Sequence, residues 1–333
     1  MPAHLNTHHD SQSPCHCIGE ILWDCLADQP ADSVDAVTSW TKYPGGAPAN
    51  VACGLATLGI PTAFIGCIGG DDGGEQLVEQ LRSRSINTAG IQRYLKATTR
   101  QVQVLRTKTG DRQFAGFIGH PNFADTHLQA QFLPLELFGL ADFLVIGSLG
   151  FAYPETRQAL QTSLTLADRH SLKVLMDVNW RPMFWAHPDA AKPMIEAVLP
   201  QVDVLKLSIE EAEWLFGTPD PKAIARLNNL EGVLMTQGAE GCTYCFNGNA
   251  GTVPGFAVEV EDTTGAGDGF VAGFLAQLCH YGISALHDPA IVRQMVNYAN
   301  AVGAIVTTHA GAIAPQPTPK EVEAFLYLNQ IRE

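Results

Sequence analysis

Several features that would point to a partner or a compartment are missing from this sequence. No stretch approaches the roughly 18 uncharged apolar residues of a membrane-spanning helix, and the N-terminal run MPAHLNTHHDSQSP lacks the apolar segment of a signal peptide. Lysine and arginine number 20 against 34 aspartates and glutamates, giving a net charge of -14, and they form no basic cluster. This argues against nucleic acid or an anionic membrane as a partner. We therefore expect a cytoplasmic protein whose residues 1–13 form a disordered tail.

The cysteines lack a metal-binding arrangement. Cys15 and Cys17 flank His16, and Cys242 and Cys245 form a single C-x-x-C. A zinc site needs a second pair or histidines at a suitable spacing, and neither place offers them. We expect buried, reduced thiols, as in other cytosolic chains.

Two common nucleotide-binding sequences are also missing. No lysine follows a glycine, which excludes a P-loop, and the H-R-D of protein kinases does not occur. The glycine-rich segment 69–77 lacks G-x-G-x-x-G, so a nicotinamide-binding Rossmann oxidoreductase is only weakly supported.

The sequence does contain a regular alternation of strand-like and helix-like segments. Continuous apolar runs predict strands buried on both faces of a parallel sheet, at 62–68, 142–147, 172–178, 202–207 and 232–236. Segments with helical periodicity lie between them. We predict a three-layer α/β/α sandwich.

Two stretches, 23–46 and 101–117, break this alternation. The second alternates polar and apolar residues and turns at Thr109–Asp111, which predicts a half-exposed hairpin. Together the stretches predict a small second sheet that acts as a lid. The expected division is a core of 14–23, 44–91 and 119–333, and a lid of 24–43 and 92–118.

The segment DTTGAGDGF, residues 262–270, leads directly into a predicted helix. Gly265, Ala266 and Gly267 leave the first helical N–H groups open to an anion, which predicts an anion site built without a lysine. Asp268 stands beside that site and could take a proton from an attacking hydroxyl. The alternative is a glycine-rich turn in which Asp268 caps the helix.

A second segment, YPGGAPANVACGLATLG, covers residues 43–59. Gly45 and Gly46 predict a tight turn, and Asn50 then falls in the opening turn of a helix, where its amide could bind a polyol. The alternative is a plain turn with a capping Asn50.

Together these two segments resemble the signatures of the ribokinase-like (PfkB) sugar kinases. The resemblance runs from GEILWD (19–24) to HAGAIAP (309–315), and DVNWR and KLSIEEAEWLFG are similar to fructokinase forms. It implies a Rossmann-like core with a β-sheet lid, a homodimer formed through the lid, and transfer of phosphate from ATP to a sugar. The expected product from fructose is fructose 6-phosphate.

The resemblance also implies residue roles in the reaction. Asp268 corresponds to the general base, and the segment 265–267 to the anion hole. Further positions correspond to contacts with the sugar or a phosphate: Asp24, Gly45, Gly46, Asn50 and Arg181.

Nucleotide and metal roles follow from the same resemblance. Thr236, Gly238, Gly241, Asn300 and Ser208 correspond to the nucleotide side of the site. Glu211 corresponds to an acid that organises Mg²⁺. Asp262, with the backbone at Val306 and Gly311, corresponds to a potassium site, although His309 stands where arginine or lysine is usual.

One segment departs from the fructokinase pattern. His120 and Phe123 replace the arginine and serine of Arg-Asn-Pro and Ser-Ala-Asp. This keeps open a PfkB kinase for another small sugar, a sugar acid such as 2-keto-3-deoxygluconate, or a nucleoside. A catalytically silent partner protein is a further alternative.

Overall fold

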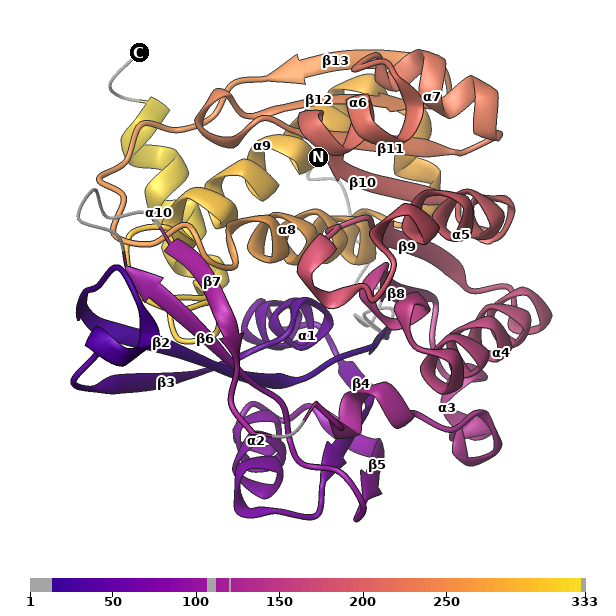
Figure 1. The fold of residues 1–333 in the computed structure, drawn as a ribbon. Coiled ribbons are helices and arrows are strands. Elements are labelled where there is room, and N and C mark those ends of the chain that lie inside the picture. Colours follow the sequence, from indigo (N-terminus) through magenta and orange to yellow (C-terminus); the bar gives the residue numbers. More distant parts are fainter. Residues whose placement is uncertain (1–13, 107–111, 120, 331–333) are drawn as a thin grey trace.

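A nine-stranded sheet forms the centre of the molecule. The computed structural model describes residues 14–106, 112–119 and 121–330. The strands lie in the order β13-β12-β11-β10-β9-β8-β1-β4-β5 (Figure 1). Their bounds are β1 Cys15–Ile18, β4 Thr62–Gly69, β5 Asn87–Tyr94, β8 Phe143–Gly147, β9 Lys173–Asp177, β10 Val204–Ser208, β11 Gly232–Thr236, β12 Cys242–Phe246 and β13 Asn249–Val253. Neighbours from β5 to β11 are parallel, while β12 and β13 add an antiparallel edge.

Helices cover both faces of this sheet (Figure 1). One layer consists of α1 Ala47–Thr57, α2 Asp72–Arg82, α8 Ala266–Tyr281, α9 Pro289–Val306 and α10 Pro319–Gln330. The other consists of α3 Leu135–Phe138, α4 Pro154–His170, α5 Ala191–Val198, α6 Ile209–Phe216 and α7 Pro221–Asn228. Alternate strand residues, such as Val174 and Leu175, join opposite apolar clusters because successive side chains point to opposite faces. The predicted three-layer sandwich is confirmed, and each of the five predicted strands is present.

A second sheet of four strands, here called the small sheet, projects from the core (Figure 1). Its order is β3-β2-β6-β7, with β2 Leu22–Pro30, β3 Trp40–Gly45, β6 Gln101–Arg106 and β7 Arg112–Phe117. Strands β6 and β7 are antiparallel, as a hairpin over 101–117 requires. The turn predicted at Thr109–Asp111 and the predicted tail lie outside the described residues. The small sheet carries its own apolar cluster around Ala27, Ala31 and Leu105.

Short 3₁₀ turns make up several of the connections. Those used below are η2 Ala124–His127, which follows β7, and η5 Pro182–Phe184, which follows β9. The others are η1 Val34–Ala36, η3 Ala130–Phe132, η4 Leu149–Ala152, η6 Pro188–Ala190, η7 Leu199–Gln201, η8 Gly238–Glu240 and η9 Ile283–His287.

All eight cysteines are buried and unpaired. Cys242 and Cys245 both lie in β12, the strand that their segment predicts. Across the described ranges, no helix has both the length and the apolar character needed to cross a membrane.

Candidate active site

The two glycine-rich segments meet at a single hydrogen bond. Asn50, in the first turns of α1, donates from Nδ2 to Oδ2 of Asp268 in α8 at 2.8 Å. The two residues are 218 positions apart in the chain, and both are buried. The fold therefore places the two candidate segments in one site.

The N-terminus of α8 has the form that the sequence predicts for an anion site. Gly265 is the N-cap residue, with φ of 78°, and Ala266 and Gly267 are the first helical residues. No side chain caps this end, and the carboxylate of Asp268 turns to Asn50 instead. Asp268 is therefore not a helix cap. The N–H of Ala266 donates to the carbonyl of Thr263 at 3.3 Å, and the next N–H groups of α8, those of Gly267 and Asp268, are open to a ligand.

The start of α1 is shaped in a similar way. Gly46 is the N-cap residue, with φ of 103°, and Asn50 does not cap the helix. Oδ1 of Asn50 is buried and has no hydrogen-bond partner in the described part of the chain. Because a buried acceptor without a donor is costly, this oxygen fits a hydroxyl of a bound molecule.

Asp24, in β2, lies beside this turn. A Cβ atom on Gly45 would collide with Oδ2 of Asp24, so the glycine leaves room for this carboxylate in the orientation it adopts. Asp24, Gly45, Gly46 and Asn50 thus gather where the small sheet joins the core.

The environment of Asp268 has opposing effects on its acidity. Burial raises the pKa of Asp268 above its usual value. The hydrogen bond from Asn50 and the positive charges of Lys206 and Arg181 lower the pKa in turn. A carboxylate that burial makes more basic, and that neighbouring cations keep ionised, suits a general base.

Lys206 was not anticipated at this site. It lies in β10, and its Nζ bonds to both carboxylate oxygens of Asp177, at 3.0 and 3.1 Å. A Cβ atom on Gly267 would lie 3.0 Å from this Nζ. The sequence predicts an anion site without a lysine, whereas in the structure a buried ammonium lies directly against the first turn of α8.

The end of β10 carries a capping box. Ser208 is the N-cap residue of α6 and its hydroxyl accepts from the backbone N–H of Glu211, while Glu211 Oε2 accepts from the N–H of Ser208 at 2.7 Å. Glu211 Oε1 accepts from the N–H of Trp180, also at 2.7 Å. Both carboxylate oxygens of Glu211 thus accept hydrogen bonds from backbone N–H groups. Through the bond to Trp180, Glu211 connects α6 to the loop that carries the exposed Arg181.

A cavity of about 450 Å³ begins at the N-terminus of α8. Its walls include Thr236, Gly238, Gly241, Ala266, Gly267 and Asn300. Asn300 Nδ2 donates to the carbonyls of Val253 and Pro254, at 3.1 and 3.0 Å, and so fixes one wall. Ser208 is not part of the cavity walls, although it pairs in register with Thr236. The size and the mainly apolar lining suit a nucleotide, with its phosphates toward Gly267.

The sequence matches known proteins over nearly its whole length. The model of the pfkB family carbohydrate kinases matches residues 13–319. A probable fructokinase-5 from Arabidopsis thaliana is 34% identical over 312 residues, covering 92% of this chain and 95% of the relative.

The chain belongs to the pfkB family of carbohydrate kinases.

Solved structures of fructokinases have the same fold. One from Xylella fastidiosa with bound ATP has a TM-score of 0.87 and 29% identity, and the match covers 96% of this chain and 99% of that one. One from Vibrio cholerae in a fructose, ADP and calcium ion bound form has a TM-score of 0.83 and 28% identity, and the match covers 95% of this chain and 100% of that one. The predictions of a ribokinase-like fold and of a fructokinase-type sugar phosphotransferase are confirmed.

Asp262 joins two loops behind the α8 N-terminus in this pfkB protein. Its Oδ1 accepts from the N–H of Thr264 at 2.9 Å and its Oδ2 from the N–H of Gly311 at 2.6 Å. The loops to which the resemblance assigns potassium are therefore in contact. Throughout 14–106, 112–119 and 121–330, no group of three or more His, Cys, Asp or Glu side chains could alone hold a metal ion.

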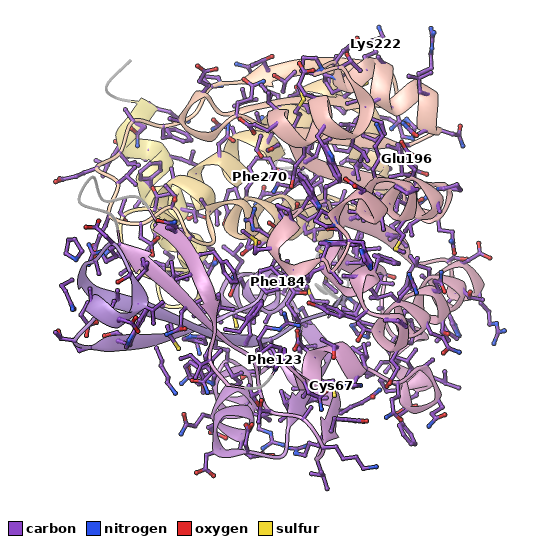
Figure 2. All side chains as sticks on the ribbon, in the orientation of Figure 1. Cys67, Phe123, Phe184, Glu196, Lys222 and Phe270 are labelled. Atoms are coloured by element: carbon purple, nitrogen blue, oxygen red, sulfur yellow. The ribbon has the colours of Figure 1, made fainter. Side chains whose placement is uncertain are left out.

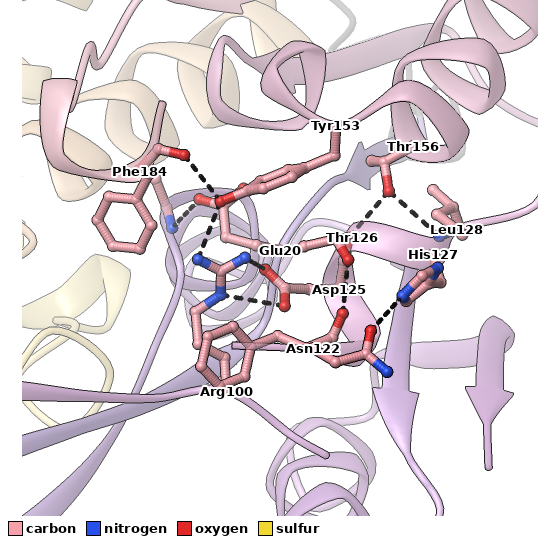
Figure 3. Close-up of polar contacts among 12 residues, drawn as sticks. Glu20, Arg100, Asn122, Asp125, Thr126, His127, Leu128, Tyr153, Thr156 and Phe184 are labelled. Carbon is pink, nitrogen blue, oxygen red and sulfur yellow. Dashed lines mark hydrogen bonds and ion pairs between the residues drawn. The ribbon is translucent and has the colours of Figure 1, made fainter. Parts of the chain in front are cut away.

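The segment that departs from the fructokinase pattern surrounds a buried arginine (Figure 3). Arg100 is 1% exposed; its Nε donates to Oδ1 of Asp125 at 3.1 Å, and its Nη2 forms an ion pair with Oδ2 at 2.9 Å. Its Nη1 donates to the hydroxyl of Tyr153 at 3.1 Å, and that hydroxyl donates to the carbonyl of Phe184. His120 lies outside the described residues.

Aromatic rings surround the same guanidinium. Two of the residues that supply them, Phe123 and Phe184, are labelled in Figure 2. The ring of Phe123 lies 4.9 Å from Arg100 Cζ, and those of Phe117, Tyr153 and Phe184 lie 5.1 to 5.3 Å away. Phe117 belongs to the small sheet and the other three to the core, so the cluster fastens one to the other. Phe123 thus serves as a packing residue beside a cation, a role that a serine could not fill.

Proposed function

We propose that this protein transfers the terminal phosphoryl group of ATP to the 6-hydroxyl of D-fructose. The observation that carries this is the buried Asp268 carboxylate, held by Asn50 at the uncapped N-terminus of α8 where the nucleotide-sized cavity begins. Relatives named fructokinases, and a fructokinase structure with fructose and ADP, support the choice of acceptor.

The sugar would lie between the two glycine-rich segments. Asp24 and Asn50 supply acceptors for its hydroxyls, and the bare turn at Gly45 and Gly46 leaves room for it. Asp268 takes the proton of the 6-hydroxyl as that oxygen forms a bond to the terminal phosphorus. The bond from this phosphorus to the bridging oxygen breaks, and its electron pair leaves with ADP.

The transferred group would lie on the first turn of α8. Gly265 and Ala266 leave room for it, and the open N–H groups of Gly267 and Asp268 would stabilise its charge. Thr236, Gly238, Gly241 and Asn300 would hold the nucleoside part of ATP in the cavity, with Ser208 in the neighbouring strand. Arg181, which lies in the exposed loop after β9, would contact a phosphate of ATP.

Metal ions would complete the site. Because the pair of Glu211 oxygens is engaged by backbone N–H groups, Glu211 would hold Mg²⁺ through water rather than directly. Bound there, Mg²⁺ neutralises charge on the phosphates. Asp262 and the backbone at Val306 and Gly311 would hold potassium, a cation that takes oxygen ligands.

The small sheet would act as the lid, with 24–43 and 92–118 as lid segments and 14–23, 44–91 and 119–330 as the core. Closing it would keep water from the phosphoryl group. Its separate apolar cluster, which includes the half-buried Trp40, supports a homodimer formed through this sheet. Eight unpaired thiols support a cytoplasmic location.

A second candidate acceptor follows from the segment at 120–123. His120 and Phe123 stand where typical fructokinases carry arginine and serine, which supports another small sugar, a sugar acid or a nucleoside as the substrate. The catalytic arrangement would be unchanged. A silent partner protein has less support, since the base and the open helix terminus are both present.

A substrate panel tests the proposal. Purified protein with ATP and Mg²⁺ is assayed on fructose, ribose, 2-keto-3-deoxygluconate and adenosine, beside Asp268→Asn. We expect the highest kcat/KM on fructose and a loss of roughly 10²- to 10⁴-fold in kcat for the variant. A higher kcat/KM on another acceptor would replace fructose, and wild-type turnover in the variant would remove Asp268 as the base.

A further inference from the structure

Lys206 occupies an unusual position for a lysine. It lies near the middle of the large sheet, between β9 and β11, and is 6% exposed. In register it pairs with Asp177 on one side and Leu234 on the other. A buried ammonium is costly unless it is paired, and Asp177 supplies the partner.

The pairing with Asp177 does not use all of the lysine's hydrogen-bonding capacity. An ammonium group has three N–H donors, and within the described ranges Asp177 accepts the only hydrogen bonds that the Lys206 ammonium donates. Gly267 lies against Nζ, since a Cβ atom built on this glycine would be 3.0 Å from the ammonium nitrogen. Glycine at 267 therefore lets the ammonium lie directly beneath the open end of α8.

The charges around Lys206 keep it protonated. Burial alone would lower its pKa, but Asp177, Glu211 and Asp268 outweigh that effect, and the net pKa is raised. Asp268 in turn is faced by Lys206, Asp177, Arg181 and the amide of Asn50. Of the two cations, Arg181 is exposed and screened by solvent, while Lys206 is buried and is not.

We propose that Lys206 is a positioning residue for phosphoryl transfer, whose ammonium, held by Asp177 against Gly267, supplies fixed positive charge behind the α8 N–H donors and beside Asp268. The inference rests on the proposed function for its chemistry. A positive charge here favours a terminal phosphate on the far side of Gly267 and keeps the Asp268 carboxylate ionised. Arg181 cannot supply the same effect, because its exposed position leaves its field screened.

The test compares two variants that differ only in this charge. Asp177→Asn keeps the ammonium beside the remaining carboxylates of Glu211 and Asp268, whereas Asp177→Asn combined with Lys206→Met removes it without leaving Asp177 charged and unpaired. If the double variant does not fold, Lys206→Gln with Asp177→Asn replaces it, since two amides can hydrogen-bond where the ion pair stood.

Two readouts do not need turnover. The first is the titration of the Asp268 carboxyl by ¹³C NMR, assigned with Asp268→Asn. The second is calorimetric binding of the β,γ-imido analogue of ATP compared with ADP. A merely structural lysine would change neither of them.

We expect the Asp268 titration to move to higher pH in the double variant relative to Asp177→Asn. We also expect its affinity for the imido analogue to fall about tenfold, with ADP affinity changed far less. The proposal would be overturned if the two variants showed the same Asp268 titration and the same ratio of affinity for the imido analogue to affinity for ADP. If wild type fails to phosphorylate fructose but these differences appear, the proposed acceptor fails while the role of Lys206 stands.

Discussion

The amide of Asn50 and the carboxylate of Asp268 are joined at 2.8 Å between the first turns of α1 and α8. This bond links the segment that holds Asp24 and Gly46 to the segment that forms the anion site. Because both residues are buried, the bond is shielded from competing water and controls the protonation of Asp268.

Replacing Asn50 with Leu should move the acid limb of activity to higher pH. The hydrogen bond lowers the pKa of Asp268, so its loss raises that pKa. A base must be ionised to act, and activity is lost as pH falls through its pKa, so the loss begins at a higher pH. We also expect kcat/KM at neutral pH to fall roughly 10- to 100-fold. A pH profile of kcat/KM measures both effects, and an unmoved limb would contradict the argument.

Gly265→Ala should destabilise the protein more than Gly217→Ala. Both glycines are in the left-handed region, with φ of 78° and 68° and ψ of 0° and 19°, which alanine adopts at a cost of about 1 kcal/mol. A Cβ at 265 would also lie 2.5 Å from that of Ala312, whereas nothing lies within 4 Å at 217. We expect a loss of about 1–3 kcal/mol for position 265 in urea unfolding. Equal losses for the two variants would show that the Ala312 contact is unimportant.

Glu20→Gln should remove a pH dependence from the stability. Burial raises the pKa of Glu20 from 4.5 to about 7, and its Oε1 accepts from the N–H of Ala47 at 3.1 Å. Between these two pKa values the folded protein binds more protons than the unfolded chain, so Glu20 makes the free energy of unfolding fall as pH rises from about 4.5 to 7.

Glutamine keeps the acceptor for Ala47 but does not ionise. Above pH 7 we expect the variant to be more stable than wild type by roughly 2–4 kcal/mol, and at pH 4 to be about equal. Urea unfolding at several pH values measures this. A constant difference across the range would contradict the assignment to Glu20.

Arg100→Met should be strongly destabilising. It leaves the carboxylate of Asp125, which is 5% exposed, buried without its cation, at a cost of about 3–5 kcal/mol. Adding Asp125→Asn removes the stranded charge and should recover part of that loss. Urea unfolding of the two single variants and the double variant gives the coupling energy. Simple additivity would show that the pair contributes no coupling.

Much of the fold could be predicted because its signals are local. Each strand of the large sheet predicted from the sequence is a continuous apolar run, as burial on both faces requires. The end of α6 at Gly217, with φ of 68°, follows from one residue. The two glycine-rich segments are likewise contiguous, and their meeting could be inferred from resemblance alone.

Lys206 was missed because its partners are distant in the sequence. Asp177 lies 29 residues earlier and Gly267 lies in another layer. One signal was present: a lysine in the middle of an apolar strand, VDVLKL, cannot stay buried without a carboxylate. The Arg100 cluster draws on separate segments around 117, 123–125, 153 and 184, and no local pattern predicts such a convergence.

The buried cysteines make the native chain resistant to thiol reagents. No thiol reaches solvent, and burial raises the pKa of Cys53, Cys67 and Cys242 to about 12, so reactive thiolate is scarce as well. Alkylation of these thiols therefore requires local or global unfolding that exposes them to solvent. The cysteines lie in the large sheet, in helices α1 and α8 and in the small sheet, so the order in which they are labelled would record which parts of the molecule open first.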